Sequence, residues 1–235
     1  MNNVILVKAN KGGVGKSWIT LQIAHALALK GKKVLIITSD SQNDIPRFAG
    51  IKDMKFERGL EHWVKHSTGN YHVLRQNLYY IPLTDTFIPD DDIKGLKNVV
   101  EALRERFDYI LIDSTPVLNL DDAFLELADQ IIIPTFLDSV TSKNIRSLLE
   151  KLELKKVKAI IPNRATRCKI EKEYLNALIS ALNKTEIVVA CPISQSAVIS
   201  RLIETGKTLF DDPKPASEKF RKIFLEVLEV IEWMI

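Results

Sequence analysis

The feature that most constrains this chain is a glycine-rich loop placed between an apolar run and a helical segment. Residues 11–17 read Lys-Gly-Gly-Val-Gly-Lys-Ser and follow the apolar run 4–7 closely. Glycines permit a tight turn in which several backbone N–H groups converge on phosphate at a helix N-terminus. Lys16 would then reach the terminal phosphates, and the Ser17 hydroxyl would hold Mg²⁺. The segment predicts a phosphate-binding loop.

The loop departs from the common G-x-x-x-x-G-K-[ST] pattern at its first position. That pattern requires glycine where this chain has Asn10, and a second lysine, Lys11, stands next to it. A lysine at the open edge of a phosphate site can neutralise phosphate charge on another subunit. Lys11 therefore distinguishes among the classes of phosphate-binding protein better than the rest of the loop does.

Short, continuously apolar runs alternate with helical patterns along the chain, which is typical of strands buried on both faces and joined by right-handed crossovers. We expect an α/β fold with a mostly parallel twisted sheet covered by helices on both faces, in one domain over residues 1–235. The predicted strands span Val4–Ala9, Lys33–Thr38, Leu78–Pro82, Tyr109–Asp113, Gln130–Pro134, Val157–Pro162 and Ile187–Ala190. The predicted helices span Lys16–Lys30, Ile93–Arg106, Thr141–Leu152 and Glu171–Leu182, with a short helix near Gly59–His66 and a final amphipathic helix over residues 220–234.

Composition excludes several classes of protein. The chain has 235 residues, 46% of them apolar and 27% charged, which argues against disorder. No apolar run reaches the roughly 18 residues that span a bilayer, and the N-terminus lacks the pattern of a signal peptide. Cys168 and Cys191 fit no CxxC spacing, so we expect reduced thiols in a cytoplasmic protein. The net charge of +3 is too small to indicate a nucleic-acid partner by itself.

Two aspartates are expected beside the loop, because ligands of open α/β sheets bind at the carboxyl ends of the strands. Asp113 ends the apolar run 109–112 and could hold Mg²⁺ directly or through water. Asp40 lies just past a predicted strand and could orient an attacking water or complete the Mg²⁺ shell. The alternative is structural: Asp113 would cap a turn, and Asp40 would belong to a polar turn.

The loop with its leading lysine resembles the deviant Walker A motif of the ParA/MinD family of P-loop ATPases. Other segments match in order. Ser-Asp-Ser-Gln-Asn at 39–43 resembles the family's D-P-Q element, and residues 109–116 resemble its Walker B stretch, which ends in D-x-x-P at Pro116. Ile-Ile-Pro-Asn-Arg at 160–164 and Cys-Pro-Ile-Ser-Gln at 191–195 resemble the segments around the base. The resemblance covers residues 4 to about 230 and implies Mg²⁺-dependent ATP hydrolysis.

The resemblance also implies roles for individual residues. Lys16 would bind the β- and γ-phosphates, and Asp40 would help to activate the hydrolytic water. Lys11 would reach across an ATP-dependent sandwich dimer to the phosphates of the other subunit. The Mg²⁺ would be handled by Ser17, Asp40 and Asp113. The implied nucleotide-binding residues are Lys11, Gly12, Gly13, Val14, Gly15, Lys16, Ser17, Trp18, Asn163, Arg164 and Pro192, with Asn163 recognising adenine.

Three departures from the family's pattern bear on hydrolysis more than on nucleotide binding. Thr38 stands where many members have an additional aspartate, and Trp18 replaces the usual second threonine after the loop. Ser41 replaces a proline and loses its conformational restriction. We expect slow hydrolysis that a partner stimulates.

Within the family, the chain is similar to small plasmid-partition ParA proteins that lack an N-terminal DNA-binding extension. Such proteins bind DNA without sequence preference, work with a ParB-like or adaptor partner, and associate with the nucleoid. A protein-positioning ATPase gives the same pattern. Binding would be directed at phosphates and steeply dependent on salt. The basic residues expected to contact DNA are Arg201, Lys207, Arg221 and Lys222, with Lys219 in support.

Other branches fit less well. A MinD-like membrane ATPase would need a basic final helix, but Glu226, Glu229 and Glu232 lie on its polar side and an anionic membrane would repel them. The apolar ending at residues 233–235 keeps this alternative open. Iron–sulfur carriers need clustered cysteines. A small-molecule ligase of the dethiobiotin-synthetase type shares the fold but would normally lack Lys11.

Overall fold

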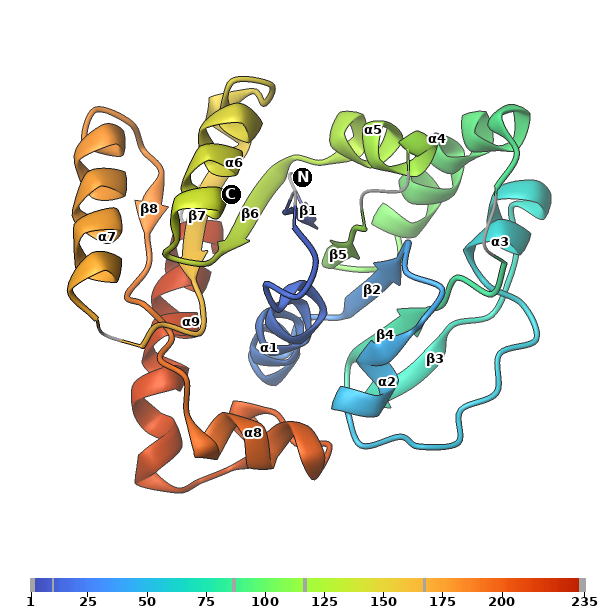
Figure 1. Ribbon diagram of the computed structural model, residues 1–235. Coiled ribbons are helices and arrows are strands. Elements are labelled where there is room, and N and C mark those ends of the chain that lie inside the picture. The colour runs from blue at the N-terminus through green and yellow to red at the C-terminus, as the bar shows by residue number, and fades with distance from the viewer. Residues whose placement is uncertain (1–2, 10, 86–87, 116–117, 167, 233–235) are drawn as a thin grey trace.

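The computed structural model describes residues 3–9, 11–85, 88–115, 118–166 and 168–232. The expectations for Asn10, Pro116 and residues 233–235 lie outside this part of the chain. The described residues build one eight-stranded sheet in the order β3-β4-β2-β5-β1-β6-β7-β8 (Figure 1). The strands are β1 (Val4–Val7), β2 (Val34–Thr38), β3 (His72–Arg75), β4 (Leu78–Ile81), β5 (Tyr109–Asp113), β6 (Gln130–Thr135), β7 (Val157–Pro162) and β8 (Val188–Val189).

Helices connect most of these strands and cover both faces of the sheet. The α-helices are α1 (Lys16–Leu29), α2 (Asp44–Phe48), α3 (Leu60–His66), α4 (Asp90–Arg104), α5 (Leu118–Leu127), α6 (Ser139–Leu149), α7 (Lys169–Leu182), α8 (Ala197–Glu204) and α9 (Pro215–Glu232). Two short 3-10 helices are η1 (Leu154–Lys156) and η2 (Leu209–Asp211). None of the helices in the described ranges is both long and apolar enough to cross a membrane.

The predicted fold class is confirmed. Every neighbouring pair of described strands is parallel except β3 with β4, which are antiparallel at one edge. The sequence analysis missed β3, because its four residues include only two apolar ones, Val73 and Leu74, and it also missed α2, α5 and α8. The other predicted strands and helices are present, with ends that differ by a few residues.

Two apolar cores lie on opposite faces of the sheet. One joins α1 and α9, with Ile19 and Phe224 among its fully buried side chains. The other lies under helices α3 to α7 and includes Leu96 and Phe124. The apolar face of α9 is buried as its spacing predicts, so this helix packs on the protein itself.

The strand order brings together the loops that carry the candidate site residues. Strand β5 lies between β1 and β2, with Val7 and Thr38 both in register with Asp113. Because these three strands are parallel, the loops that follow them leave the same edge of the sheet. The loop 11–15 after β1, residues 39–43 after β2 and residues 114–115 after β5 therefore meet.

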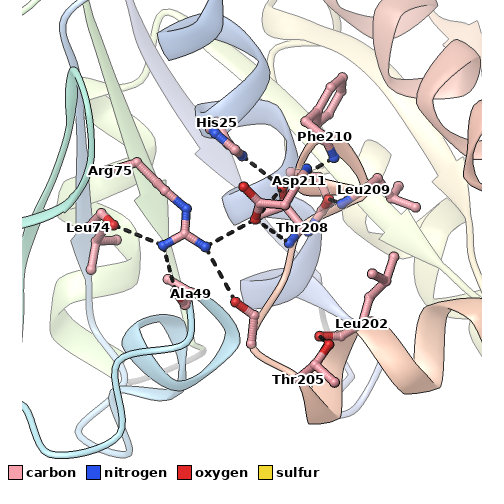
Figure 2. A network of polar contacts seen from close by, with 12 residues as sticks. His25, Ala49, Leu74, Arg75, Leu202, Thr205, Thr208, Leu209, Phe210 and Asp211 are labelled. Atoms are coloured by element: carbon pink, nitrogen blue, oxygen red, sulfur yellow. Dashed lines mark hydrogen bonds and ion pairs between the residues drawn. The ribbon is translucent and has the colours of Figure 1, made fainter. Parts of the chain in front are cut away.

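An arginine on the edge strand ties distant segments together (Figure 2). Arg75 donates through Nη1 to the carbonyl of Ala49 at 2.6 Å, just past α2. Through Nη2 it donates to the carbonyl of Gly206 at 3.3 Å and to the Asp211 carboxylate at 3.1 Å. Asp211 also accepts the backbone N–H of Thr208 at 2.8 Å. Arg75 thus fixes α2 against the segment that follows α8.

A buried histidine completes this network. His25 of α1 has its Nδ1 2.7 Å from the Thr208 hydroxyl, and burial is the main reason that the pKa of its imidazole lies below the usual value. Asp211 acts in the opposite direction. The helix that starts at the phosphate loop is therefore anchored to the same cluster as α2 and α8.

We predict that Arg75→Ala destabilises the protein by about 2 kcal/mol, because it leaves a carboxylate and several carbonyl groups without their charged donor. Urea unfolding followed by circular dichroism measures this loss. Arg58→Ala is the matched control, since Arg58 is exposed. Equal unfolding free energies for the two variants would contradict the role given to the Arg75 network.

Candidate nucleotide-binding site

The loop after β1 has the backbone geometry that a phosphate loop requires. Gly13 and Gly15 have φ angles of +76° and +93°, in the left-handed region that strains residues with a Cβ. Gly15 is the N-cap of α1, so the positive end of the helix dipole points toward the loop. Lys16 is buried at the first helical position. Backbone donors and one lysine therefore gather at a single point.

A cavity of about 570 Å³ opens over this loop. Its walls come from segments that are far apart in sequence: the loop, the residues after β2 and β5, the end of β7 and helix α8. The lining residues are Gly12, Gly13, Gly15, Lys16, Ser17, Trp18, Asp40, Gln42, Asp44, Phe48, Thr115, Asn163, Arg164, Ser194, Gln195, Ser196, Ile199, Ser200 and Ile203. The volume falls within the range of small-molecule and cofactor sites.

Asp113 is a buried carboxylate at the base of the site, with 1% of its surface exposed. Burial raises the pKa of its carboxyl from 3.8 to about 6, although the Ser17 hydroxyl and the Lys16 charge act in the opposite direction. Its Oδ1 atom has no hydrogen-bond partner among the described residues. A carboxylate oxygen left free beside a hydroxyl fits the oxygen ligands that Mg²⁺ prefers. Ser17 and Asp113 would hold the ion, with Asp40 near them.

Asp40 is half-buried in the cavity wall, and its loop is held by local hydrogen bonds. Its backbone N–H donates to the Thr38 hydroxyl at 3.0 Å, and its Oδ1 accepts the N–H of Gln42 at 2.9 Å. The next loop is linked to it: the N–H of Thr115 donates to the Ser39 hydroxyl at 2.8 Å. No residue in the described part of the chain donates a hydrogen bond to Oδ2 of Asp40, so this oxygen can accept one from a water or ligate an ion in the cavity.

Asn43 is a site-forming residue that the sequence analysis did not single out. It adopts a left-handed conformation with φ of 50°, which asparagine tolerates better than most residues. Its side-chain Oδ1 accepts the Tyr80 hydroxyl at 2.6 Å, and its Nδ2 donates to the Leu83 carbonyl at 2.7 Å. Asn43 therefore anchors the loop that carries Asp40 to strand β4 and to Leu83, two residues beyond the end of that strand.

Lys11 lies apart from Lys16. It does not line the cavity, and 39% of its side chain is exposed. Its Nζ lies 3.5 Å from the Asp138 carboxylate and 5.3 Å from the centre of the Phe136 ring. Asp138 is also the N-cap of α6, where its Oδ1 accepts the Thr141 N–H at 2.7 Å. The second lysine thus rests on the turn between β6 and α6.

The part of the cavity that is lined by the end of β7 and by helices α2 and α8 combines polar groups with an apolar wall. Asn163 and Arg164 lie at the end of β7, whereas Pro192 is half-buried and does not belong to the lining. The wall is formed by Phe48, Ile199 and Ile203, which the sequence analysis missed. The apolar spacing of residues 198, 199, 202 and 203 could have revealed helix α8.

Trp18 stands at the start of α1, at the position where the sequence pattern described above usually has a threonine. It borders the cavity with 5% of its surface exposed, and its ring meets Phe224 edge-on at 5.7 Å. Its Nε1 has no hydrogen-bond partner among the described residues. The indole therefore links the phosphate-loop helix to α9.

The basic residues expected to contact DNA lie together near α8 and α9, but several have partners within the protein. Arg201 pairs with Asp212 at 2.9 Å, and Arg221 donates to the backbone carbonyl of Asp212. Lys222 pairs with Glu218 at 3.2 Å, one turn away on α9. Lys207 is exposed. A DNA phosphate would compete with an existing carboxylate at Arg201 and Lys222.

The sequence of the chain is similar to those of several known proteins. A family model described as an AAA domain matches residues 2–167. The septum site-determining protein MinD of Thermotoga maritima is 34% identical over 131 residues, which cover 48% of this chain and 44% of that protein. The sporulation initiation inhibitor protein Soj of Bacillus subtilis is 26% identical over 167 residues, 66% of each chain. The chain spans about half the length of the first curated relatives it matches.

Solved structures share the fold over the whole chain. A candidate plasmid partition protein of Borrelia burgdorferi B31, solved with AMPPNP bound, superposes with a TM-score of 0.79 and covers 100% of both chains. The two sequences are 23% identical. At that identity the match demonstrates a common fold.

We predict that Asp113→Asn stabilises the nucleotide-free protein at neutral pH. Because the native carboxyl has the raised pKa, the folded state holds its proton more tightly than the unfolded chain does. The wild-type free energy of unfolding therefore falls as the pH rises from about 4 through about 6. A shift of about two pKa units corresponds to about 3 kcal/mol.

Urea unfolding of wild type and Asp113→Asn at about pH 4 and about pH 8 measures this difference. The advantage of the variant should grow toward the higher pH. Asp53→Asn, at an exposed position, is the control for the change of side chain. If the difference in unfolding free energy between Asp113→Asn and wild type does not change with pH, the raised pKa of the buried carboxyl is contradicted.

Proposed function

The chain belongs to the ParA/MinD family of P-loop ATPases, and from that premise we propose that it binds ATP with Mg²⁺ in this cavity and hydrolyses it slowly. Support comes from the convergence of the loop, Lys16, Ser17 and Asp113 at one end of the cavity. The ion would neutralise charge on the β- and γ-phosphates. The AMPPNP bound to the Borrelia protein of the same fold is consistent with this assignment.

In this proposal one set of residues binds the phosphates and another positions the attacking water. Backbone N–H groups of residues 12–16 and the Lys16 ammonium bind the phosphates, because both present positive charge at the helix N-terminus. Asp40 holds the attacking water through its free carboxylate oxygen. The hydrogen bonds between the loops after β2 and β5 keep Asp40 in place relative to Asp113. The absence of a second aspartate at Thr38 favours slow hydrolysis.

The single observation that carries the rest of the proposal is the position of Lys11. Its side chain is 39% exposed, does not line its own cavity, and is held by a half-exposed ion pair with Asp138. Such a pair contributes about 0–1 kcal/mol, so a triphosphate on a second subunit can displace it. We propose that two subunits form a sandwich in which each Lys11 reaches the phosphates of the other. ATP would favour the dimer over ADP because it offers more negative charge.

We further propose that the ATP-bound dimer binds DNA without sequence preference and moves or positions a cargo, such as a plasmid or chromosome, on the nucleoid. A small ParB-like or adaptor partner would stimulate hydrolysis and release the dimer. Support comes from the small partition proteins that the chain resembles and from the cluster of basic residues at α8 and α9. The nucleotide switches DNA affinity only if it favours the dimer, which is the competent state.

Lys11→Ala is predicted to abolish dimerisation with AMPPNP while leaving the nucleotide affinity of the monomer nearly unchanged, because Lys11 lies outside its own cavity. Light scattering during size-exclusion chromatography measures the mass, and calorimetry measures the affinity. Lys32→Ala, at another exposed lysine, is the control and should dimerise as wild type does. A dimer of Lys11→Ala with AMPPNP would refute the sandwich.

Lys207→Ala is predicted to weaken DNA binding by the ATP-bound dimer and to lower the slope of log affinity against log salt concentration by about 1. The reason is the loss of one phosphate contact and its released counterion. Fluorescence anisotropy with labelled duplexes measures both quantities, with Lys184→Ala, at an exposed position after α7, as the control. An unchanged slope would show that Lys207 does not contact a DNA phosphate. Binding to anionic vesicles in place of DNA would favour the MinD-like alternative.

A further inference from the structure

We propose that Gly50 and Gly206, together with Arg75, set the separation of helices α2 and α8 and thereby shape the part of the cavity that receives the nucleoside of a bound nucleotide. The inference rests on the proposed binding of ATP in this cavity. The three residues are positioning residues, since none of them lines the cavity itself.

The segments that follow α2 and α8 meet backbone against backbone. A Cβ placed on Gly206 would lie 2.1 Å from the Cα of Gly50, and a Cβ placed on Gly50 would lie 2.7 Å from the carbonyl oxygen of Gly206. Both glycines also have φ angles in the left-handed region, +82° at Gly50 and +63° at Gly206. A side chain at either position would therefore force the two segments apart.

Each glycine closes the last turn of its helix, next to residues that line the cavity. The N–H of Gly50 donates to the carbonyl of Arg47 at 3.0 Å, and the N–H of Gly206 donates to the carbonyl of Ile203 at 3.2 Å. Phe48 and Ile203, which line the cavity, precede the two glycines by two and three positions. A change in the distance between the glycines therefore moves these two side chains relative to each other.

Arg75 holds the two helix ends together from the edge strand β3 (Figure 2). Its guanidinium donates to the carbonyls of Ala49 and Gly206, which lie just past α2 and α8. Carbonyl groups at helix C-termini carry partial negative charge, which the guanidinium compensates. The Asp211 carboxylate, 3.1 Å from Nη2, keeps the guanidinium in place. Neither helix end can move away without losing a hydrogen bond to a charged donor.

The wall that these contacts shape is apolar. Phe48 of α2 and Ile199 and Ile203 of α8 line the cavity, and all three are half-buried because they pack on the core behind them. Phosphate groups belong at the loop beside Lys16 and have no apolar surface to bury. The base and the ribose carry the apolar faces of a nucleotide, so this wall suits the nucleoside.

The test compares ADP with inorganic pyrophosphate, each with Mg²⁺, by calorimetry. The two ligands differ by the adenosine group, and neither carries the third phosphate that would favour dimerisation. Gly50→Ala should weaken ADP binding by about tenfold, the lower end of the effect of a methylene-sized misfit in an apolar pocket, and leave pyrophosphate binding unchanged. Gly206→Ala should have the same effect from the other side of the contact.

Gly31→Ala is the matched control. Gly31 follows α1 and has φ of +81°, nearly the angle of Gly50, but a Cβ there would meet nothing within 4 Å. The control therefore reproduces the backbone strain of Gly50→Ala without the contact, and it should bind both ligands as wild type does. Arg75→Gln is the further variant in case neither of the other alanine variants folds, and it should also weaken ADP binding more than pyrophosphate binding.

Hydrogen exchange without ligand tests the contact itself. Gly50→Ala should accelerate exchange in the peptide spanning residues 199–207, and Gly206→Ala should accelerate it in the peptide spanning residues 44–51. The reason is that each substitution loosens the segment on the opposite side of the contact. Gly31→Ala should leave both peptides at the wild-type rate.

Three results would overturn the proposal: equal weakening of ADP and pyrophosphate in Gly50→Ala, no weakening of either ligand, or unchanged exchange in the segment opposite the substitution. Failure of the wild type to bind either ligand would refute the proposed function instead. The exchange measurement would then still decide whether the two glycines hold α2 against α8.

Discussion

The burial of one carboxylate at the carboxyl end of β5 is the constraint around which this site is organised. Asp113 is almost completely enclosed, and an isolated ionised carboxylate is costly to bury. The hydroxyl of Ser17 and the charge of Lys16 compensate for part of that cost, and burial still dominates, since the pKa of the carboxyl remains near 6. A divalent cation would supply the missing compensation. Lys16 and Ser17, which we propose to bind the phosphates and the ion, therefore also reduce the cost of burying this carboxylate.

Two lysines of the loop differ in environment in a way that suits two different tasks. Lys16 is buried at the start of α1 within its own cavity, whereas Lys11 is exposed and rests on Asp138 at the turn before α6. A buried lysine is fixed and serves one site. An exposed lysine in a weak ion pair can leave it at little cost when a stronger anion approaches. The contrast between them connects nucleotide binding to self-association in the function that we propose.

Much of the fold could be predicted from the sequence because continuously apolar runs such as residues 109–112 mark strands buried on both faces. The loop at 11–17 was visible because its residue types are required by its backbone shape. The network around Arg75 and His25, by contrast, joins residues up to 183 positions apart, and nothing in the local pattern indicates such a contact. Helix α8 was missed although its apolar residues have helical spacing, whereas the role of Asn43 depends on a left-handed conformation that its neighbours do not signal. The bonding of Asn163 to Val14 likewise appears only once β7 lies near the loop.

The central claim, that each phosphate site is completed by a lysine of the other subunit, is tested most directly by mixing two inactive variants. Lys11→Ala lacks the lysine that it would donate, and Asp40→Ala lacks the residue that orients the water. In a mixed dimer, the site of the Lys11→Ala subunit keeps Asp40 and receives Lys11 from its partner. At high protein concentration an equal mixture should recover ATP turnover that neither variant has alone, up to about half of the wild-type value, since each mixed dimer has one complete site of its two. A mixture no more active than the two variants measured separately would contradict the account.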